Sequence, residues 1–188
     1  MALIHRATLV PSKLDAIAAW IPTQPWWDGS EAEELDAVAA YRFDDPDGEV
    51  GIETHLLRSS SGTVLQVPLT YRSAPLPGAD AYLVATMEHS VLGKRWVYDG
   101  VGDPVFVAVT IAAIVEGAHQ AELVVQSADG SRSVRESTTQ VWGTGGRAST
   151  SPRLHVRRVI DSVPTELPHL LGTWQGQDEP IVLVELRN

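Results

Sequence analysis

Cysteine is absent from this chain of 188 residues. Without a thiol, the protein can form no disulfide, offer no thiolate ligand to zinc and use no cysteine nucleophile. Basic residues are also scarce, because 14 Lys and Arg side chains stand against 24 Asp and Glu side chains, for a formal net charge of −10. Phosphate backbones are held by clustered Lys and Arg. This balance therefore argues against nucleic-acid binding and against binding to an anionic membrane surface.

Long hydrophobic runs are missing as well. No stretch approaches the ~18 apolar residues of a membrane-spanning helix, and the first ten residues, MALIHRATLV, lack the apolar core of a secretory signal. We therefore expect no membrane segment and a cytoplasmic location. The 44% hydrophobic and 20% charged residues are typical of a globular protein. This length allows one sizeable core or two small, closely packed subdomains.

The N-terminal half reads as one helix followed by strands. Ser12 and Asp15 have the spacing of a helix N-cap and its acidic partner, which predicts a helix over 12–21 that ends at Pro22. Turn residues then separate four segments with strand periodicity. These predicted strands are residues 37–43, 49–58, 63–72 and 81–88. We expect them to form one antiparallel sheet with the helix packed on a face. Pro68 lacks a backbone N–H, so it predicts an edge strand or a bulge.

The C-terminal half begins with a second helix start. Asp103 and Pro104 suit the N-cap and first positions of a helix over 104–116, and Gly117 ends it. The β-branched residues of this segment keep a strand tenable there. Further strands, and a flexible loop at 143–152, follow. The predicted strands are 120–128, 133–142, 154–161 and 180–187. Short strands joined by turns, with a few packed helices, indicate an α+β fold built on antiparallel sheets.

Aromatic side chains are the first candidates for a binding site. Trp26 and Trp27 lie in the turn PWWDG together with Asp28. An indole ring offers a flat apolar face on which a sugar ring can stack, and a carboxylate beside it can bind hydroxyls. The alternative is that these rings fill the core. Trp27 is the expected partly exposed ring, since neighbours in a turn seldom both bury. The later turn with Tyr98 and Asp99 supplies further candidate ligand contacts.

Signals for catalysis or metal binding are weak. The histidines lack the paired spacing of metal ligands, so we predict neither a metal site nor a cofactor. They are His5, His55, His89, His119, His155 and His169. His89, Ser90 and Asp99 are close in sequence, but no Gly-x-Ser-x-Gly turn accompanies them. Residues 143–147, GTGGR, lack the Gly-Lys-Ser/Thr ending of a phosphate-binding loop and read as a loop between strands.

Three short motifs follow one another along the chain. They are the aromatic turn PWWDG at 25–29 after the first helix, the strand residues QVPL at 66–69, and YDGVGDP at 98–104, a turn into the second helix. Maltokinase N-terminal cap domains have similar motifs in the same order: an aromatic turn with Arg where this chain has Pro25, a YQVPL-type strand and a YDA…DP turn into a helix. The chain therefore resembles the maltokinase cap family over roughly residues 10–117.

The resemblance implies two regions. These are a cap-like subdomain over 1–92 and, over 93–188, an intermediate subdomain similar to the small lobe of a protein kinase. In the family, a Lys on the last strand of that region binds ATP phosphates. The best counterpart is 183–187, with Val184 at the Lys position. Maltokinases carry a large catalytic lobe after this point, and this chain ends before such a lobe begins. We therefore expect cap and small-lobe architecture without kinase activity.

The resemblance also implies a function. We expect a non-catalytic interaction or regulatory module of bacterial trehalose, maltose or glycogen (α-glucan) metabolism, with a protein of that metabolism as its partner. One alternative is a carbohydrate- or small-ligand-binding domain that holds a sugar or α-glucan through the aromatic turn. Another is an enzyme of α-glucan metabolism whose site has no recognisable motif. Whether the chain is an enzyme is thus left open, and a non-enzyme is the preferred interpretation.

Overall fold

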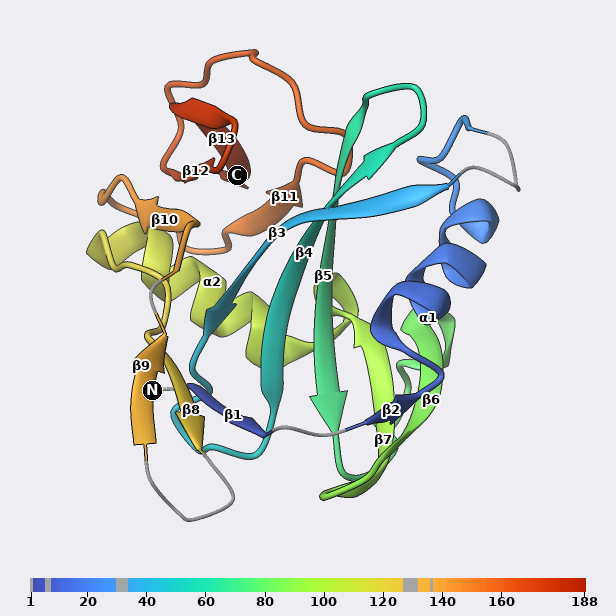
Figure 1. Cartoon of the computed structure of the whole chain (residues 1–188). Helices are drawn as coiled ribbons and strands as arrows, with labels where there is room; N and C mark the ends of the chain where they lie inside the picture. Colours follow the sequence, from blue (N-terminus) through green and yellow to red (C-terminus); the bar gives the residue numbers. More distant parts are fainter. Residues whose placement is uncertain (1, 6–7, 30–33, 127–131, 136) are drawn as a thin grey trace.

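The computed structural model of the chain describes residues 2–5, 8–29, 34–126, 132–135 and 137–188. Its described strands form three sheets, and two α-helices pack against them (Figure 1). In chain order the strands and α-helices are β1 (Ala2–His5), β2 (Leu9–Val10), α1 (Lys13–Trp20), β3 (Leu35–Phe43), β4 (Gly51–Ser59), β5 (Val64–Arg72), β6 (Leu83–His89), β7 (Gly93–Asp99), α2 (Pro104–Glu116), β8 (Leu123–Gln126), β9 (Arg132–Arg135), β10 (Gln140–Gly143), β11 (Arg153–Val156), β12 (His169–Trp174) and β13 (Gln177–Arg187). Neither described helix is long and apolar enough to span a bilayer.

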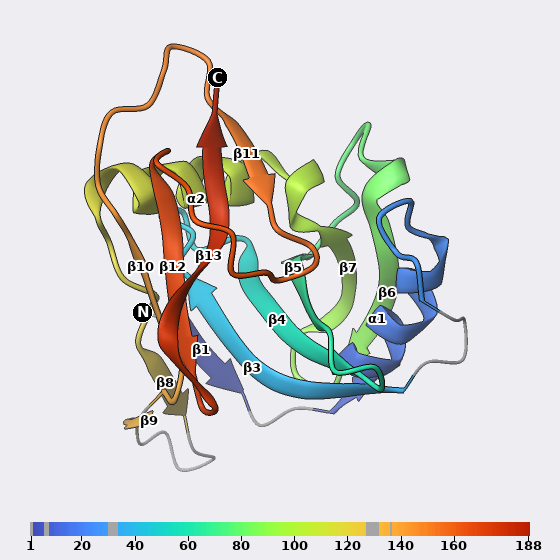
Figure 2. The ribbon, with the colours of Figure 1, turned by 90° about the horizontal axis from the view of Figure 1, so that it is seen from above.

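The six-stranded sheet has the order β2-β6-β7-β5-β4-β3, and all of its pairings are antiparallel. It curls into a half-barrel, which Figure 2 shows from above. The four predicted strands of the N-terminal half all lie in this sheet, so that prediction is confirmed. The sequence analysis missed β7, because its short run of mixed charged and aromatic residues is followed at once by the turn residues 100–104.

Pro68 lies inside this sheet, on β5, so the prediction of an edge strand or a bulge there is wrong. The β4–β5 register is continuous from Gly51 to Arg58, and β5 has β7 as its other neighbour. The backbone N–H of Gln66 points away from β4 and donates to the carbonyl of Arg158 (2.8 Å). Pro68 is two residues further along the strand, so its backbone nitrogen also points away from β4. Its missing N–H therefore removes no hydrogen bond between β4 and β5. On its other side, Pro68 lies between the Gln66–Arg158 hydrogen bond and Leu69, where the pairing with β7 begins.

The two faces of this sheet pack against different elements. One face, together with α1, forms the α1-side core, whose buried members are Ala16, Ile17, Trp20, Ile21, Leu35, Leu57, Leu65, Val67, Leu69, Met87 and Val97. As predicted, α1 begins at Ser12, whose hydroxyl accepts a hydrogen bond from the N–H of Asp15 (3.1 Å). The other face contributes Ile52 and Leu56 to a second core. Alternation along β4 thus sends neighbouring apolar residues to opposite sides.

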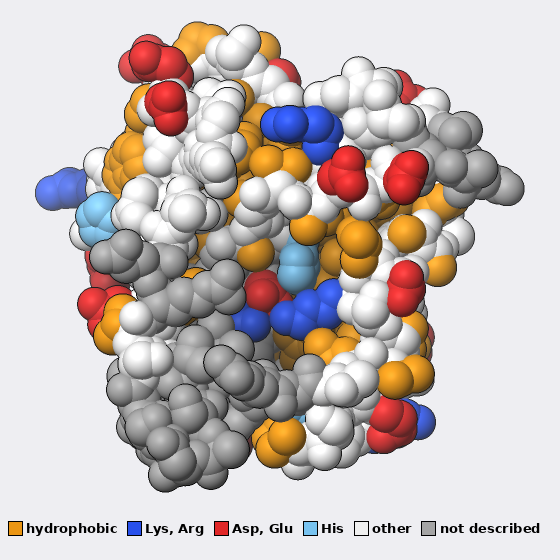
Figure 3. Space-filling view, in the orientation of Figure 1, with side chains coloured by type: hydrophobic (Ala, Val, Ile, Leu, Met, Phe, Trp, Pro, Cys, Tyr) orange, Lys and Arg blue, Asp and Glu red, His pale blue; other side chains and the backbone are white. Residues whose placement is uncertain are grey.

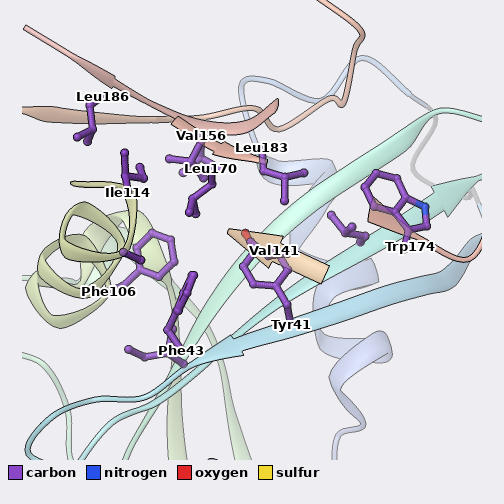
Figure 4. Packing of buried hydrophobic residues seen from close by; sticks show 14 of the residues in the cluster. Tyr41, Phe43, Phe106, Ile114, Val141, Val156, Leu170, Trp174, Leu183 and Leu186 are labelled. Carbon is purple, nitrogen blue, oxygen red and sulfur yellow. The ribbon is translucent and has the colours of Figure 1, made fainter. Parts of the chain in front are cut away.

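The second core lies between the sheet, α2 and the C-terminal strands, and we call it the α2-side core. Figure 4 shows it from close by; its labelled members are Tyr41, Phe43, Phe106, Ile114, Val141, Val156, Leu170, Trp174, Leu183 and Leu186. Leu35 and Tyr41 are an even number of residues apart on β3, so regular alternation would place both side chains on the same face. They nevertheless belong to different cores. A shift of register between Ala37 and Ala39 explains this, because a bulge moves the following side chains to the opposite face.

The start of α2 is fixed to the end of β5. As predicted, Asp103 caps the helix: its Oδ1 accepts a hydrogen bond from the N–H of Val105 (3.0 Å). The same carboxylate, which is fully buried, accepts two bonds of 2.7 Å from the guanidinium of Arg72. Burial raises the pKa of Asp103, but the bonds from Arg72 and Val105 outweigh it and leave the pKa below its usual value. Gly117, in the left-handed conformation, ends the helix as predicted.

The C-terminal strands form a four-stranded antiparallel sheet in the order β10-β12-β13-β11. The predicted strand 133–142 is in fact two strands, β9 and β10, which belong to different sheets. β12 was not predicted, and neither was the parallel pairing of β1 with β8. Parallel pairing joins segments about 120 residues apart in sequence, and no local turn pattern can reveal such a partner.

One buried side chain connects the two sheets. Gln66 has no exposed surface, and its amide nitrogen donates to the carbonyls of Leu183 (2.8 Å) and Arg157 (3.2 Å). Its amide oxygen accepts a hydrogen bond from the hydroxyl of Tyr41 (2.9 Å). Together with the backbone bond to Arg158, these contacts join β3 and β5 to the strand β13 and to the segment that follows β11.

Replacing Gln66 should therefore destabilise the whole chain. We expect Gln66→Leu to lower the free energy of unfolding by roughly 1–3 kcal/mol, because it leaves buried polar groups without partners. Urea denaturation followed by circular dichroism measures this. The exposed Gln175→Leu, in the β12–β13 turn, is the matched control, with an expected change within about 0.5 kcal/mol. A double-mutant cycle with Tyr41→Phe should show coupling; additive effects of the two substitutions would contradict the hydrogen bond between them.

Candidate functional sites

The aromatic turn lies against α1 and the C-terminal half. The ring of Trp26 is 6.0 Å from that of Trp20, at an interplanar angle of 59°. The guanidinium of Arg158 lies over the Trp26 ring, 5.3 Å from its centroid, so one face of this indole is already in contact with a cation. Trp27 is also half-buried and packs against the α1-side core, whereas Asp28 is exposed. The indole N–H of Trp27 is buried and has no hydrogen-bond acceptor in the structure.

Tyr98 and Asp99, the other predicted ligand contacts, are buried at 2% and 4% exposure. The hydroxyl of Tyr98 accepts a hydrogen bond from the N–H of Leu76 (2.9 Å). Asp99 forms an ion pair with Arg158. Burial raises the pKa of Asp99, and the neighbouring Arg158 offsets this only in part. Arg158 therefore connects Asp99 with Trp26, a link that the sequence analysis missed because no spacing rule joins residues so far apart.

A pocket of about 500 Å³ opens beside this link. Trp26 and Arg158 form part of its wall, together with His155, Arg157 and Arg187. All three arginines are already paired, since Arg157 and Arg187 both donate to the carboxylate of Glu185 and Arg158 donates to Asp99. Of the predicted contacts, the structure brings Trp26 to this pocket. Tyr98 and Asp99 do not line it.

A second charged site is centred on Glu53 of β4, which is 8% exposed. Its carboxylate binds Arg42 (2.9 Å) from β3 and Lys13 from α1, and His55 lies 3.4 Å from it. These side chains lie on the face of the sheet that α1 covers, and Figure 3 shows cationic, acidic and histidine side chains gathered in a hollow at the centre of that side of the molecule. Burial raises the pKa of Glu53, but His55, Arg42 and Lys13 together outweigh it and hold the pKa well below 4.5.

This shift predicts a pH dependence of stability. A carboxylate whose pKa is lowered by folding contributes stability above its unfolded pKa, and the contribution is lost as the pH falls through the folded value. We expect the wild-type free energy of unfolding to fall below about pH 4.5, the usual value for Glu. Glu53→Gln should lower stability at pH 7 by about 1–3 kcal/mol, since it removes the charged partner of two half-buried cations, and should make stability depend less on pH at acidic pH.

Chemical denaturation from pH 3 to 7 measures this effect. The exposed Glu49→Gln provides a matched control, because it removes the same charge from the surface and should leave the pH profile unchanged. A Glu53→Gln variant with the wild-type slope below pH 4.5 would show that the ion pairs do not form in solution.

The glycine-rich loop does not hold its amides open for a phosphate. The N–H groups of Gly145 and Gly146 donate to the carbonyls of Ile114 (2.9 Å) and Val115 (3.2 Å) at the end of α2. Gly143 packs directly on α2, since an added Cβ would lie 2.1 Å from the carbonyl oxygen of Ala113. The loop therefore caps the helix. Among the described residues, no group of three His, Asp or Glu side chains could hold a metal ion.

The third candidate is an apolar groove of about 600 Å³ along the outer side of α2. Val105 and Val109, half-buried, and the exposed Ala108 and Ala112 lie along it. The sequence carried a signal for this groove. The helix PVFVAVTIAAIVE is apolar on every side, which is typical of a fully buried helix, yet one side is uncovered in the chain.

The rim of this groove is acidic. Its described charged residues are Asp44, Asp45, Asp47 and Glu116. The first three belong to the β3–β4 turn, where the carboxylate of Asp45 accepts the N–H groups of Asp47, Glu49 and Val50 and so fixes the turn. The α2 groove is thus an apolar surface bordered by negative charge, and the sequence analysis did not identify it as a site.

Comparison with known families gives one match. Residues 20–103 match the family model described as the maltokinase N-terminal cap domain. The match lies within the 10–117 predicted from the motifs, which confirms that resemblance, and it includes the aromatic turn, the QVPL strand and the turn into α2. No curated protein matches the chain.

Proposed function

Because residues 20–103 of this chain form a maltokinase N-terminal cap domain, we propose that the protein is a non-catalytic interaction or regulatory module of α-glucan metabolism. It acts in the bacterial cytoplasm through a protein partner that belongs to trehalose, maltose or glycogen metabolism. The cap domain supports the metabolic context. We also propose that the C-terminal half corresponds to the small-lobe-like region of that family.

The observation that carries this proposal is the α2 groove. A helix that is apolar on all sides has to bury them, and here the inner side packs in the α2-side core while Ala108 and Ala112 remain exposed. Exposed apolar surface bordered by polar residues is typical of protein interaction sites. We infer that the partner covers this side of α2.

The buried polar groups support a structural rather than a catalytic use. Val184, which resembles the ATP-binding Lys position, is 1% exposed and belongs to the α2-side core. Glu53, Asp103 and Glu185 each bind Arg side chains in ion pairs that join elements of the fold. Carboxylates held in this way stabilise the fold, and Asp103 also fixes the start of α2.

Affinity capture from native lysate tests the interaction. We expect the wild-type chain to enrich an enzyme of α-glucan metabolism, and Ala112→Arg to lose it, because the long cation fills the groove. Ala74→Arg, at an exposed loop position, makes the same change elsewhere and should capture as the wild type does. Quantitative mass spectrometry of the proteins captured by the wild type and by the two variants measures this enrichment. Equal enrichment by the wild type and Ala112→Arg would overturn the proposed site.

A second candidate function is α-glucan binding at the pocket that Trp26 lines. If the chain uses it, tryptophan fluorescence should shift and saturate with maltotetraose at about 0.1–1 mM, that is roughly 4–5 kcal/mol. Trp26→Ala, which removes the indole that lines the pocket, should lose the response and keep the thermal midpoint. Trp96→Ala, outside this turn, should keep the response. A flat wild-type titration, or unfolding of Trp26→Ala, would assign the aromatic turn to the core.

A further inference from the structure

The α2 groove has the length and shape of a helix-binding surface. Val105, Val109 and Ala113 recur at intervals of four residues, so they form one stripe along the helix axis. From Val105 to Ala113 the stripe is about 12 Å long, which is slightly more than two helical turns. Ala108 and Ala112 lie beside it, and small side chains allow another helix to approach closely.

The opposite wall of the groove comes from the β3–β4 turn. Phe43, at 7% exposure, closes the floor, and the rigid turn that Asp45 holds gives the groove a fixed edge. The groove therefore does not depend on a rearrangement of α2. A preformed apolar groove of this kind is the surface on which an amphipathic helix lays its apolar face.

The charges select the partner. Acidic residues border the stripe, with Asp44 and Asp47 on the turn and Glu116 at the C-terminal end of α2. The whole chain carries a formal net charge of −10, so the surrounding field has the same sign. A symmetric dimer through this groove would bring acidic rims together, which is unfavourable.

From these contacts we propose that the α2 groove binds an amphipathic helix of another protein, with small and branched apolar residues along one face and Lys or Arg bordering that face. The inference rests on the proposed interaction function and adds the chemistry of its partner. The apolar face covers Val105, Val109 and Ala112, and the flanking cations pair with Asp47 and Glu116.

Two synthetic helical peptides test whether the acidic rim selects a basic helix. One has about 15 residues, enough for a helix to form on binding, with Leu and Ala along one face and Lys on the flanks; its twin has Glu in place of each Lys. In isothermal titration calorimetry we expect saturable binding of the Lys peptide, weakening as salt rises, and no binding of the Glu peptide. Amide shifts in NMR spectra should concentrate on α2 and residues 44–47.

Matched variants localise the effect. The double variant Asp47→Lys, Glu116→Lys should lower the affinity for the Lys peptide roughly tenfold or more, because like charges now face each other. The same variant should raise the affinity for the Glu peptide. Asp178→Lys with Glu179→Lys, exposed on β13, makes the same net change away from the groove and should alter affinity less than about threefold. Ala112→Arg should abolish binding without changing the circular dichroism spectrum.

The outcomes separate this inference from the function on which it rests. Equal affinity for both peptides, or NMR shifts that lie away from α2, would overturn the proposal that the partner is a basic helix. This holds even if Ala112→Arg still loses the native partner. Concentration-dependent dimerisation that Ala112→Arg abolishes would likewise overturn it, by assigning the groove to a second copy. Retention of the native partner by Ala112→Arg in lysate would instead overturn the proposed function.

Discussion

The buried amide of Gln66 is the interaction on which the arrangement of the two halves depends. It satisfies a carbonyl of β13, a carbonyl of the segment after β11 and the hydroxyl of Tyr41, and it has no exposed surface. A buried amide without those partners would be costly, so this side chain holds β5 to β13 and to the segment after β11. The C-terminal strands and α2 pack in the same core.

Fixing the C-terminal sheet in this way leaves α2 covered on one side only. Phe106 and Ile114 are buried in the α2-side core, and Asp103 holds the start of the helix to Arg72. At the other end, the amides of Gly145 and Gly146 bind the last carbonyls. A helix fixed at both ends and buried on its inner side presents its remaining apolar residues as a rigid surface. The residues similar to the maltokinase cap motifs thus act in this chain as supports for that surface.

Local patterns in the sequence predicted the elements well where a cap or a turn marked them. Ser12 and Asp103 identified both α-helices, and turn residues separated β3, β4, β5 and β6. Patterns failed where the structure depends on distant partners. Pro68 predicted an edge strand or a bulge, because the sequence does not show that β5 contacts first the segment at Arg158 and then β7 on the side away from β4. β12 and the pairing of β1 with β8 were missed for the same reason.

The candidate sites show the same difference between local patterns, which the sequence reveals, and distant contacts, which it does not. The sequence pointed to Trp26 and Asp99 separately, but only the fold brings them together, through Arg158. The cluster around Glu53 combines residues from α1, β3 and β4, so no linear motif could reveal it. The α2 groove was visible in part, since a helix without a polar face already implies a partner on every side. Which side the chain itself leaves uncovered depends on packing.

Site-specific photo-crosslinking inside the native cell tests the central claim most directly. A photoreactive benzoyl-phenylalanine at position 112, on the exposed side of α2, should give one covalent adduct with an enzyme of α-glucan metabolism. Sequencing of the crosslinked peptide should place the contact in a helix that carries Lys or Arg. The same group at Val91, which is 57% exposed in the β6–β7 turn, should give no such adduct. Adducts that are absent from position 112, or identical at the two positions, would contradict an interaction module built around the uncovered side of α2.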